Sequence, residues 1–199
     1  MKFPKEKARL IQIIKDYKKN NDYDAIIMKK DDIMLLVDEL DDTAVIDDLL
    51  MSMFMQTHYD DIIILGEELN KKGYESWTEL YYLLLSCLGN LDIFYGMSLI
   101  NRSTILNDAV IKEYYSEDGS NYLNILLTNK ITVIEKTVLI LVNFIIGLFI
   151  TIKSKVVITK EFLAIDFFAL LDTLYEFGNS EEVIKELTDK IKMMFFPEV

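Results

Sequence analysis

Two side chains in this sequence have the chemistry of a nucleophile and a general base. They are Cys87 and His58, the only cysteine and the only histidine among 199 residues. A cysteine and a histidine in contact can carry nucleophilic catalysis. No flanking signature supports such a pair, since Cys87 lies in the apolar run Leu84–Leu88 and His58 follows Gln56-Thr57 at an expected turn between helices. We predict a buried structural thiol, an exposed turn histidine and no catalytic residue.

The same counts argue against the common metal and cofactor sites. One cysteine and one histidine cannot form a cysteine–histidine zinc site, and a single histidine cannot complete a di-iron site with two Glu-x-x-His motifs. Ser116-Glu117-Asp118-Gly119 lacks the spacing of a calcium loop, and no glycine-rich phosphate loop occurs. A carboxylate site for magnesium stays open, but no pattern singles one out. We expect no metal, no cofactor and no enzymatic activity.

The elements that hold these residues are predicted to be helices. With 51% hydrophobic residues the chain is too apolar for disorder, and its two prolines, Pro4 and Pro197, leave everything between them free of proline, which breaks helices. Ser76 and Glu79 have the spacing of a capping box, and Gly73 and Gly178 fit the left-handed position after a helix. A loop is expected at 114–120. Apolar spacing predicts helices at about 5–19, 31–40, 43–56, 60–72, 76–88, 92–106, 120–128, 132–153, 159–177 and 180–195.

The most apolar segment runs from Thr137 to Ile152 without a charge. As a helix it would be about 24 Å long, which is short of a hydrocarbon core of about 30 Å. Asn143 and Gly147 lie within it. We therefore favour a core helix buried on all sides, with a short or tilted membrane span or a peripheral anchor as the alternative.

The net charge of −12 is unevenly distributed along the chain. Residues 1–20 carry a net charge of +5 and residues 21–70 a net charge of −12. So acidic a chain argues against direct binding to nucleic-acid phosphates, which requires lysine and arginine. The acidic pairs of 21–70 lie at or near expected helix starts, where they stabilise the helix dipole. An acidic face for a basic partner is the alternative. The pairs are Asp31-Asp32, Asp41-Asp42, Asp47-Asp48 and Asp60-Asp61.

A shift of 34 residues aligns 43–76 with 77–110, and each segment would form a helical hairpin. The alignment pairs four identical residues, among them Ser52 with Ser86. A hairpin of this length resembles the tetratricopeptide (TPR) repeat. Tyr59-Asp60-Asp61-Ile62 is similar to the start of the second helix in that family, and Leu88-Gly89-Asn90-Leu91 resembles its inter-helix turn. The proline that closes each repeat is absent. The resemblance implies a helical scaffold that binds peptides or proteins without catalysis.

A second resemblance concerns the C-terminal part. A very apolar helix is followed by a lysine-containing connection, an aromatic-rich helix at 162–175 and an amphipathic last helix. This order is similar to poxviral Bcl-2-like proteins, in which other helices wrap a central apolar helix. That resemblance implies an inhibitor of host signalling. The cellular Bcl-2 motif Asn-Trp-Gly-Arg is missing, since the only tryptophan is Trp77.

The aromatic residues are most simply explained as packing in the core. A binding groove is the alternative, because Tyr and Trp combine an apolar body with a hydrogen-bonding group. Three polar residues, Asn101, Arg102 and Asn121, would supply contacts in such a groove. The aromatic candidates are Trp77, Tyr81, Tyr82, Phe94, Tyr95, Tyr114 and Tyr115.

These observations predict an all-α protein of antiparallel helical hairpins, arranged as a TPR-like repeat or a bundle, with a very apolar C-terminal core helix. We expect an N-terminal helical segment (1–42), TPR-like hairpins (43–115) and a C-terminal helical region packed on them (116–199). The charged N-terminus has no secretory signal, which favours the cytoplasm. The expected function is non-catalytic binding of another protein or peptide, and a Bcl-2-like inhibitor or an acidic nucleic-acid mimic is the alternative. No direct nucleic-acid binding and no membrane insertion is expected.

Overall fold

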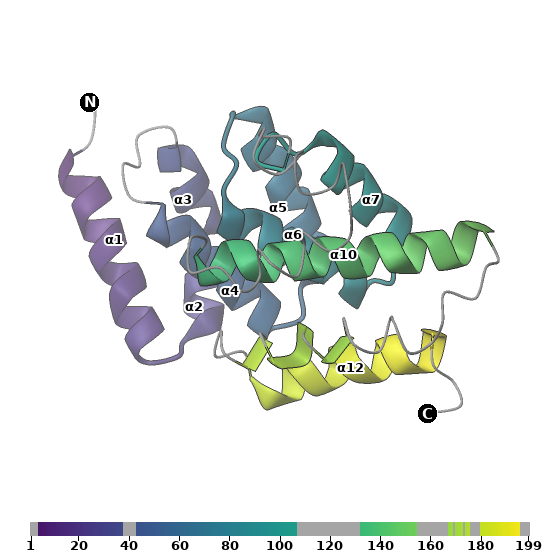
Figure 1. Cartoon of the computed structure of the whole chain (residues 1–199). Helices are drawn as coiled ribbons and strands as arrows, with labels where there is room; N and C mark the ends of the chain where they lie inside the picture. Colours follow the sequence, from purple (N-terminus) through teal and green to yellow (C-terminus); the bar gives the residue numbers. More distant parts are fainter. Residues whose placement is uncertain are drawn as a thin grey trace. The chain divides into compact units, whose positions relative to one another are not determined.

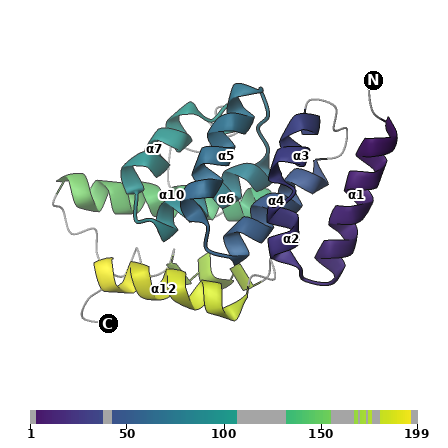
Figure 2. The same ribbon diagram turned by 180° about the vertical axis from the view of Figure 1, so that it is seen from behind.

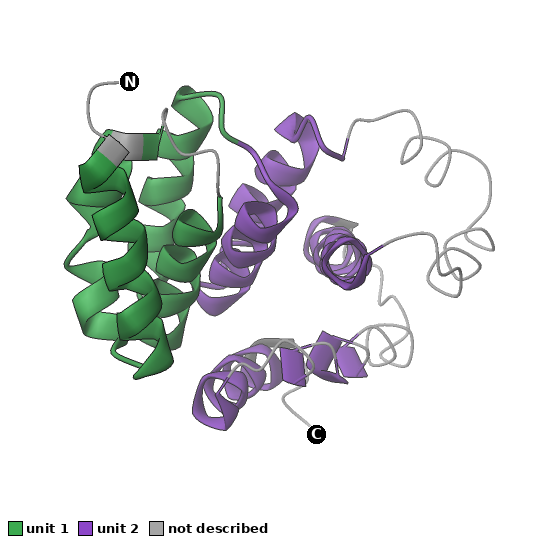
Figure 3. Ribbon diagram, turned by 90° about the vertical axis from the view of Figure 1, so that its left-hand side faces the viewer, with its two compact units in different colours: residues 1–74 green, residues 75–199 purple. Residues whose placement is uncertain are grey.

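The chain is all-α, as predicted. The computed structural model describes residues 4–37, 43–106, 132–154, 167–168, 170–172, 174–175 and 180–195. These residues form helices joined by turns, and no strand occurs among them (Figures 1 and 2). The chain divides into two compact units, residues 1–74 and 75–199 (Figure 3).

The first unit is built around helix α4 (Ala44–Met55). Helices α1 (Pro4–Lys19), α2 (Tyr23–Ile27), α3 (Lys30–Leu36) and α5 (Tyr59–Lys71) all pack against it. The apolar faces of these helices meet in one core, as the spacing of their hydrophobic residues requires. Side chains that are fully or almost fully buried there include Ile14, Ile26, Ile33, Leu49, Leu50, Phe54, Ile62 and Leu65.

The second unit is built around helix α6 (Trp77–Gly89). Helices α7 (Ile93–Arg102), α10 (Val133–Ser154) and α12 (Glu181–Phe195) pack against α6, and α10 also packs against α7. In Figure 3 the apolar helix α10 is seen nearly end-on beside α6 and α7. The buried side chains of α10 are Thr137, Val138, Leu139, Ile140, Leu141, Val142, Phe144, Ile145 and Leu148.

One type of turn connects α1 to α2, α4 to α5, and α6 to α7. In each turn one residue adopts a left-handed backbone, with φ of 53° at Asn21, 57° at Thr57 and 58° at Leu91. The N–H of the next residue donates to a carbonyl five residues earlier, over 3.0 Å from Asp22 to Tyr17, 2.9 Å from His58 to Met53 and 2.8 Å from Asp92 to Cys87. This bond satisfies a carbonyl that the end of the helix would leave unpaired. The chain thereby reverses within about three residues and forms a helical hairpin.

The predicted caps at Ser76 and Gly73 are confirmed. Ser76 accepts from the backbone N–H of Glu79 at 3.0 Å, and the Glu79 carboxylate accepts from the N–H of Ser76 at 3.3 Å, which completes a capping box. Gly73 follows α5 with φ of 77°. The Ser180 hydroxyl accepts from the N–H of Val183 at the start of α12. These caps are local, so sequence spacing was sufficient to find them.

Two local predictions were wrong. Helix α2 was not expected, because Asn20-Asn21-Asp22 reads as a loop and the helix has only five residues; Asp22 caps it by accepting from the N–H of Ala25. Helix α7 ends at Arg102 rather than near Leu106. The N–H of Thr104 donates to the Glu75 carboxylate at 3.1 Å instead of to a helical carbonyl.

Several predictions fall outside the described residues. They are the loop at 114–120, the helix at 120–128, Gly178 and Asp41-Asp42. Of the predicted helix 159–177, the described residues 167–168, 170–172 and 174–175 are helical. The division at 42/43 and 115/116 stays a prediction, since the first boundary lies at the edge of the described residues and the second lies outside them.

Thr57 gives a test of the turn. A β-branched residue with positive φ is disfavoured by about 1–2 kcal/mol, whereas glycine adopts this backbone freely. We expect Thr57→Gly to raise the free energy of unfolding by about 1 kcal/mol, as measured by urea denaturation. The matched control is Gln56→Gly, since Gln56 has φ of −99° and there glycine only adds flexibility to the unfolded chain. The turn assignment is wrong if both variants lose stability equally.

Candidate functional site

The Cys87 thiol is buried in α6, as predicted. The pKa of Cys87 is raised to about 12, mainly by burial and in part by the negative charge of Asp92, while Arg102 acts in the opposite direction. A nucleophilic cysteine needs a thiolate and access to solvent. Cys87 has neither at neutral pH, so it serves as a small apolar core residue.

His58 is exposed at a turn, which is also as predicted. It occupies the N-cap position of α5, and its Nδ1 lies 3.5 Å from the Asp61 carboxylate, with 43% of the side chain exposed. Asp61 in turn lies in the first turn of the helix. This arrangement is that of a solvated helix start and gives the imidazole one carboxylate neighbour.

The aromatic candidates within the described residues do not gather in one groove. Tyr81 and Tyr82 are buried in α6 with their rings in edge contact, 4.9 Å between centroids. Trp77, the first residue of α6, is partly buried. Helix α10 packs on α6, so the tyrosines of α6 belong to the core of the second unit. Tyr114, Tyr115 and Asn121 lie outside the described residues.

Two exposed aromatic contacts lie on α7. Arg102 stacks over the Tyr95 ring at 5.4 Å and donates to the Tyr95 hydroxyl at 2.8 Å. Phe94 is 58% exposed and meets the Phe149 ring of α10 edge-on at 5.5 Å. The Lys153 ammonium lies 5.1 Å from the same Phe149 ring. Of the three polar groove candidates, Arg102 therefore contacts an aromatic candidate, while Asn101 is exposed on α7.

Glu75 fixes the end of α7. Its carboxylate accepts from the Ser103 hydroxyl at 2.6 Å, and from both the backbone N–H and the hydroxyl of Thr104. Ser103 is buried, so its hydroxyl requires a partner. Sequence spacing gave no sign of this contact, because 28 residues separate Glu75 from Ser103.

Gly96 allows α7 to approach its neighbours closely. A Cβ atom at this position would lie 3.3 Å from Cγ2 of Ile145 in α10 and 3.5 Å from Cβ of Cys87 in α6. The three helices therefore meet at this residue without a side chain between them. The contact brings the middle of α7 against α10. Phe94 lies at the exposed edge of this contact between α7 and α10.

Helix α10 has more apolar residues than the core of the second unit buries. Among the described residues, Val133–Lys153 is the one helix long and apolar enough to cross a membrane, and half of its most apolar window is buried. The prediction that it is buried on all sides is therefore too strong, because Ile150 and Ile152 near its C-terminal end are exposed. Its other face forms the core with α6 and α7.

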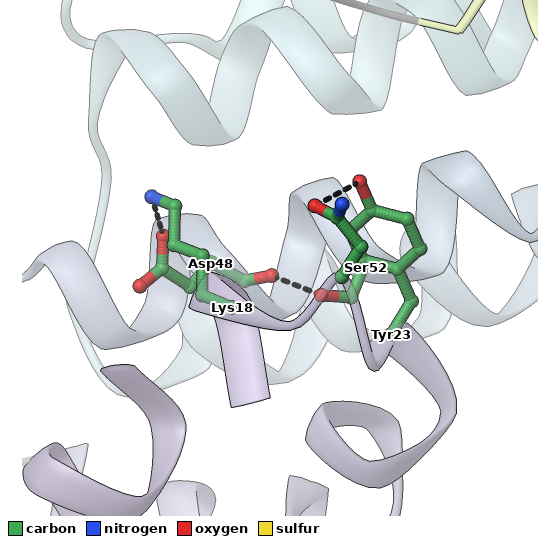
Figure 4. Close-up of polar contacts among 5 residues, drawn as sticks. Lys18, Tyr23, Asp48 and Ser52 are labelled. Atoms are coloured by element: carbon green, nitrogen blue, oxygen red, sulfur yellow. Dashed lines mark hydrogen bonds and ion pairs between the residues drawn. The ribbon is translucent and has the colours of Figure 1, made fainter. Parts of the chain in front are cut away.

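Six of the described acidic residues of 21–70 lie at helix starts, as the dipole interpretation predicts, whereas Glu67 and Glu68 lie in the C-terminal half of α5. Asp24, Asp31-Asp32, Asp47 and Asp60-Asp61 lie in the first turns of α2, α3, α4 and α5. Asp48 is different, because it is buried and pairs with Lys18 of α1 (Figure 4). The Ser52 hydroxyl, one turn further along α4, donates to the backbone carbonyl of Asp48 at 2.7 Å.

The described residues contain no group of three or more His, Cys, Asp or Glu side chains placed to hold a metal ion. The acidic pairs thus stabilise helix termini individually rather than converging on one point. A carboxylate site within the described ranges has no support from side-chain geometry.

No family model matches this chain, and no curated protein or solved structure matches it either. The resemblances to TPR repeats and to Bcl-2-like proteins therefore depend on its own residues.

The Cys87 thiol should be unreactive in the native protein. A pKa of about 12 in place of about 9 lowers the thiolate fraction at pH 8 by roughly a thousandfold. We expect no reaction with Ellman's reagent until denaturant is added. Because the folded pKa lies above the unfolded one, the neutral thiol stabilises the fold below about pH 9 and this contribution declines toward about pH 12.

Cys87→Ala is the control for that pH dependence, because the variant keeps every other group that titrates at alkaline pH. Its unfolding free energy should fall less steeply above pH 9 than that of the unmodified chain. Rapid native labelling, or identical slopes for the two proteins, would contradict the burial of this thiol.

The Lys18–Asp48 pair should contribute to the stability of the first unit. Lys18→Met leaves the mostly buried Asp48 carboxylate without its cation, which should lower the unfolding free energy by about 1–3 kcal/mol. Lys19→Met removes an exposed charge next to it and should change stability by less than about 0.5 kcal/mol. Urea denaturation of both variants measures the difference, and equal effects would refute the role of the pair.

Proposed function

We propose that this chain is a non-catalytic helical-repeat scaffold that binds another protein in the cytoplasm. The observation that carries the proposal is the match between the hairpin turns after α4 and after α6, which share a left-handed turn that also ends α5 at Gly73. Thr57 and Leu91 are 34 residues apart and adopt the same left-handed backbone within the same hydrogen-bond pattern. A period of this length is typical of helical-hairpin repeats, which serve as binding scaffolds.

The buried positions support the same period. Ser52 and Ser86 are both fully buried, and each hydroxyl donates at 2.7 Å to the carbonyl four residues earlier. Other positions 34 apart are also buried in both hairpins. They include Tyr59 and Ile93, Ile62 and Gly96, and Leu65 and Leu99; in α6 every residue from Glu79 to Gly89 is buried, so its positions would match at any shift.

The first hairpin extends this pattern with a spacing of 36. Its turn at Asn21 precedes Tyr23-Asp24-Ala25-Ile26-Ile27, and the turn at Thr57 precedes Tyr59-Asp60-Asp61-Ile62-Ile63. Ile26 and Ile62 are both fully buried.

The chemistry of the reactive side chains favours binding over catalysis. Burial keeps the Cys87 thiol neutral, and the exposed His58 has Asp61 as its carboxylate neighbour at a helix start. Neither residue has the environment of an activated nucleophile or a general base.

The outer stripe of α5 is the surface we assign to the partner. Ile64 is 52% exposed, and Asp60, Glu67 and Glu68 lie beside it at helical spacing. An apolar side chain surrounded by carboxylates fits a basic partner with an apolar anchor. We call these four residues the acidic stripe.

Quantitative affinity capture from the native organism tests the proposal. The full-length chain and the variant Asp60→Asn with Glu68→Gln serve as baits, followed by calorimetry with the purified hit. We expect one protein to bind directly, with affinity reduced about fivefold by the variant and reduced further as salt rises.

The matched control is Asp31→Asn with Glu182→Gln, which removes two exposed acids in other helices. It should bind as the unmodified chain does. The scaffold proposal fails if no captured protein binds directly when purified. The assignment to the acidic stripe fails if both variants lose affinity equally.

A Bcl-2-like inhibitor of host signalling is the second candidate. The observation in its favour is the packing of α10, a helix with one acidic residue, Glu135, against α6 and α7. The same capture experiment separates the two candidates. A death or inflammatory signalling protein that still binds the acidic-stripe variant with full affinity would favour this second candidate.

A further inference from the structure

Helix α1 presents basic side chains to solvent on an otherwise acidic chain. Leu10 and Ile14 face the core of the first unit and are buried. The helical period places Lys5, Gln12 and Lys19 on the opposite side, where they are exposed. In Figures 1 and 2 helix α1 lies at the edge of the first unit, with α2 and α3 on one side of it. The exposed outward residues, which we call the basic face, are Lys5, Ala8, Arg9, Gln12, Lys15, Asp16 and Lys19.

The basic face has a net charge of +3, because it contains four cations and one acid, Asp16. The other charged residues of α1 lie outside this face. Glu6 and Lys7 have opposite charges that cancel, and Lys18 pairs with Asp48. The basic face is therefore a local excess of positive charge.

The acids of the neighbouring helices lie beside the basic face, because α2, α3 and α4 pack against the buried side of α1. Asp22 caps α2, and Asp32 pairs with Lys29 at 3.0 Å. A flat polyanion such as a bilayer or a duplex would approach these acids as well, whereas a single helix about 10 Å wide contacts the basic face alone. The remaining charged residues of these three helices, besides Asp48, are Asp24, Lys30, Asp31 and Asp47.

The outward side of α5 has the opposite charge. Ile62 and Leu65 of α5 are buried, whereas its five charged residues are exposed apart from the half-buried Glu67. Four acids and one lysine give α5 a net charge of −3. Lys72, just after the helix, donates from its ammonium to the Met34 carbonyl at 3.2 Å. The five charged residues of α5 are Asp60, Asp61, Glu67, Glu68 and Lys71.

The two helices also match position by position. Eleven positions separate Lys5 from Asp16 on α1, and the same number separates Asp60 from Lys71 on α5. Two such helices side by side and parallel would therefore bring Lys5 opposite Asp60, and Asp16 opposite Lys71. The one acid of the basic face thereby meets the one lysine of α5. Both faces are exposed within one chain, so they do not cover each other there.

We propose that the basic face of α1 binds the outward side of α5 on a second copy of this chain. In this register the aliphatic stem of Arg9 covers Ile64, and its guanidinium reaches Glu68 one turn further along. At 0.15 M salt the Debye length is about 8 Å, so the repulsion between two chains of net charge −12 is largely screened, whereas the paired faces lie within that distance. The proposal rests on the assignment of the acidic stripe as a binding surface, but it needs no foreign partner.

Analytical ultracentrifugation of the purified full-length protein at 0.15 M salt tests the proposal. A contact between two helices belongs to the small interfaces, so we expect a dissociation constant on the order of 0.1 mM and a mean mass that rises with concentration. Lys5→Glu with Arg9→Glu should weaken association at least tenfold, because acids then face acids. Asp60→Lys with Glu68→Lys should weaken it as much, although the net charge changes from −12 to −8.

An equal mixture of these two variants should associate again, because the intact α1 of one variant meets the intact α5 of the other. The matched control is Glu182→Lys with Asp189→Lys, which makes the same change in net charge at two exposed acids of α12. It should associate at least as strongly as the unmodified chain, and circular dichroism checks that all variants fold.

A chain that stays monomeric at every concentration would overturn the proposal, as would association that survives either charge reversal. A mixture that stays monomeric, or equal weakening in the control, would also overturn it. A captured basic protein that binds the acidic stripe of a monomeric chain would overturn the second copy as the occupant and leave the scaffold function standing.

Discussion

The helical hairpins of both units depend on one backbone hydrogen bond, from the residue after a left-handed turn to a carbonyl five residues earlier. A helix end leaves carbonyls unsatisfied, and this bond removes one of them while it reverses the chain. Glycine makes this turn most easily, as Gly73 does after α5, yet Asn21, Thr57 and Leu91 occupy it elsewhere. The free energy gained when the hairpins pack therefore offsets the cost of the left-handed backbone at these residues. The turns direct the packing of the helices, and the packing in turn stabilises the turns.

A hairpin cannot bury its own apolar surface, so each unit needs further helices. In the first unit α4 packs against α1, α2, α3 and α5, so these four helices together cover its buried side chains. In the second unit α10 covers α6 and α7, and the absence of a side chain at Gly96 lets the three helices meet. The tyrosines of α6 therefore lie in the core of the second unit.

Features determined by neighbouring residues could be predicted from the sequence. The capping box at Ser76 and Glu79 and the burial of Cys87 follow from spacing and local composition. Features determined by distant residues could not be. Glu75 ends α7 early by accepting from Thr104, and Lys18 neutralises Asp48 from another helix. Helix α2 was missed because its propensity is weak and packing against α4 stabilises it.

The bond from Lys190 to Gly89 has a consequence for synthesis on the ribosome. The two residues are 101 positions apart, so the end of α6 lacks this partner until α12 has been translated. At 5–20 residues per second, this interval lasts roughly 5–20 s. During that time the apolar face of α6 has no covering α12, whereas every helix of the first unit is already available. The nascent chain therefore has a period in which α10 already covers α6 and α7 while the part of α6 that α12 contacts is still uncovered.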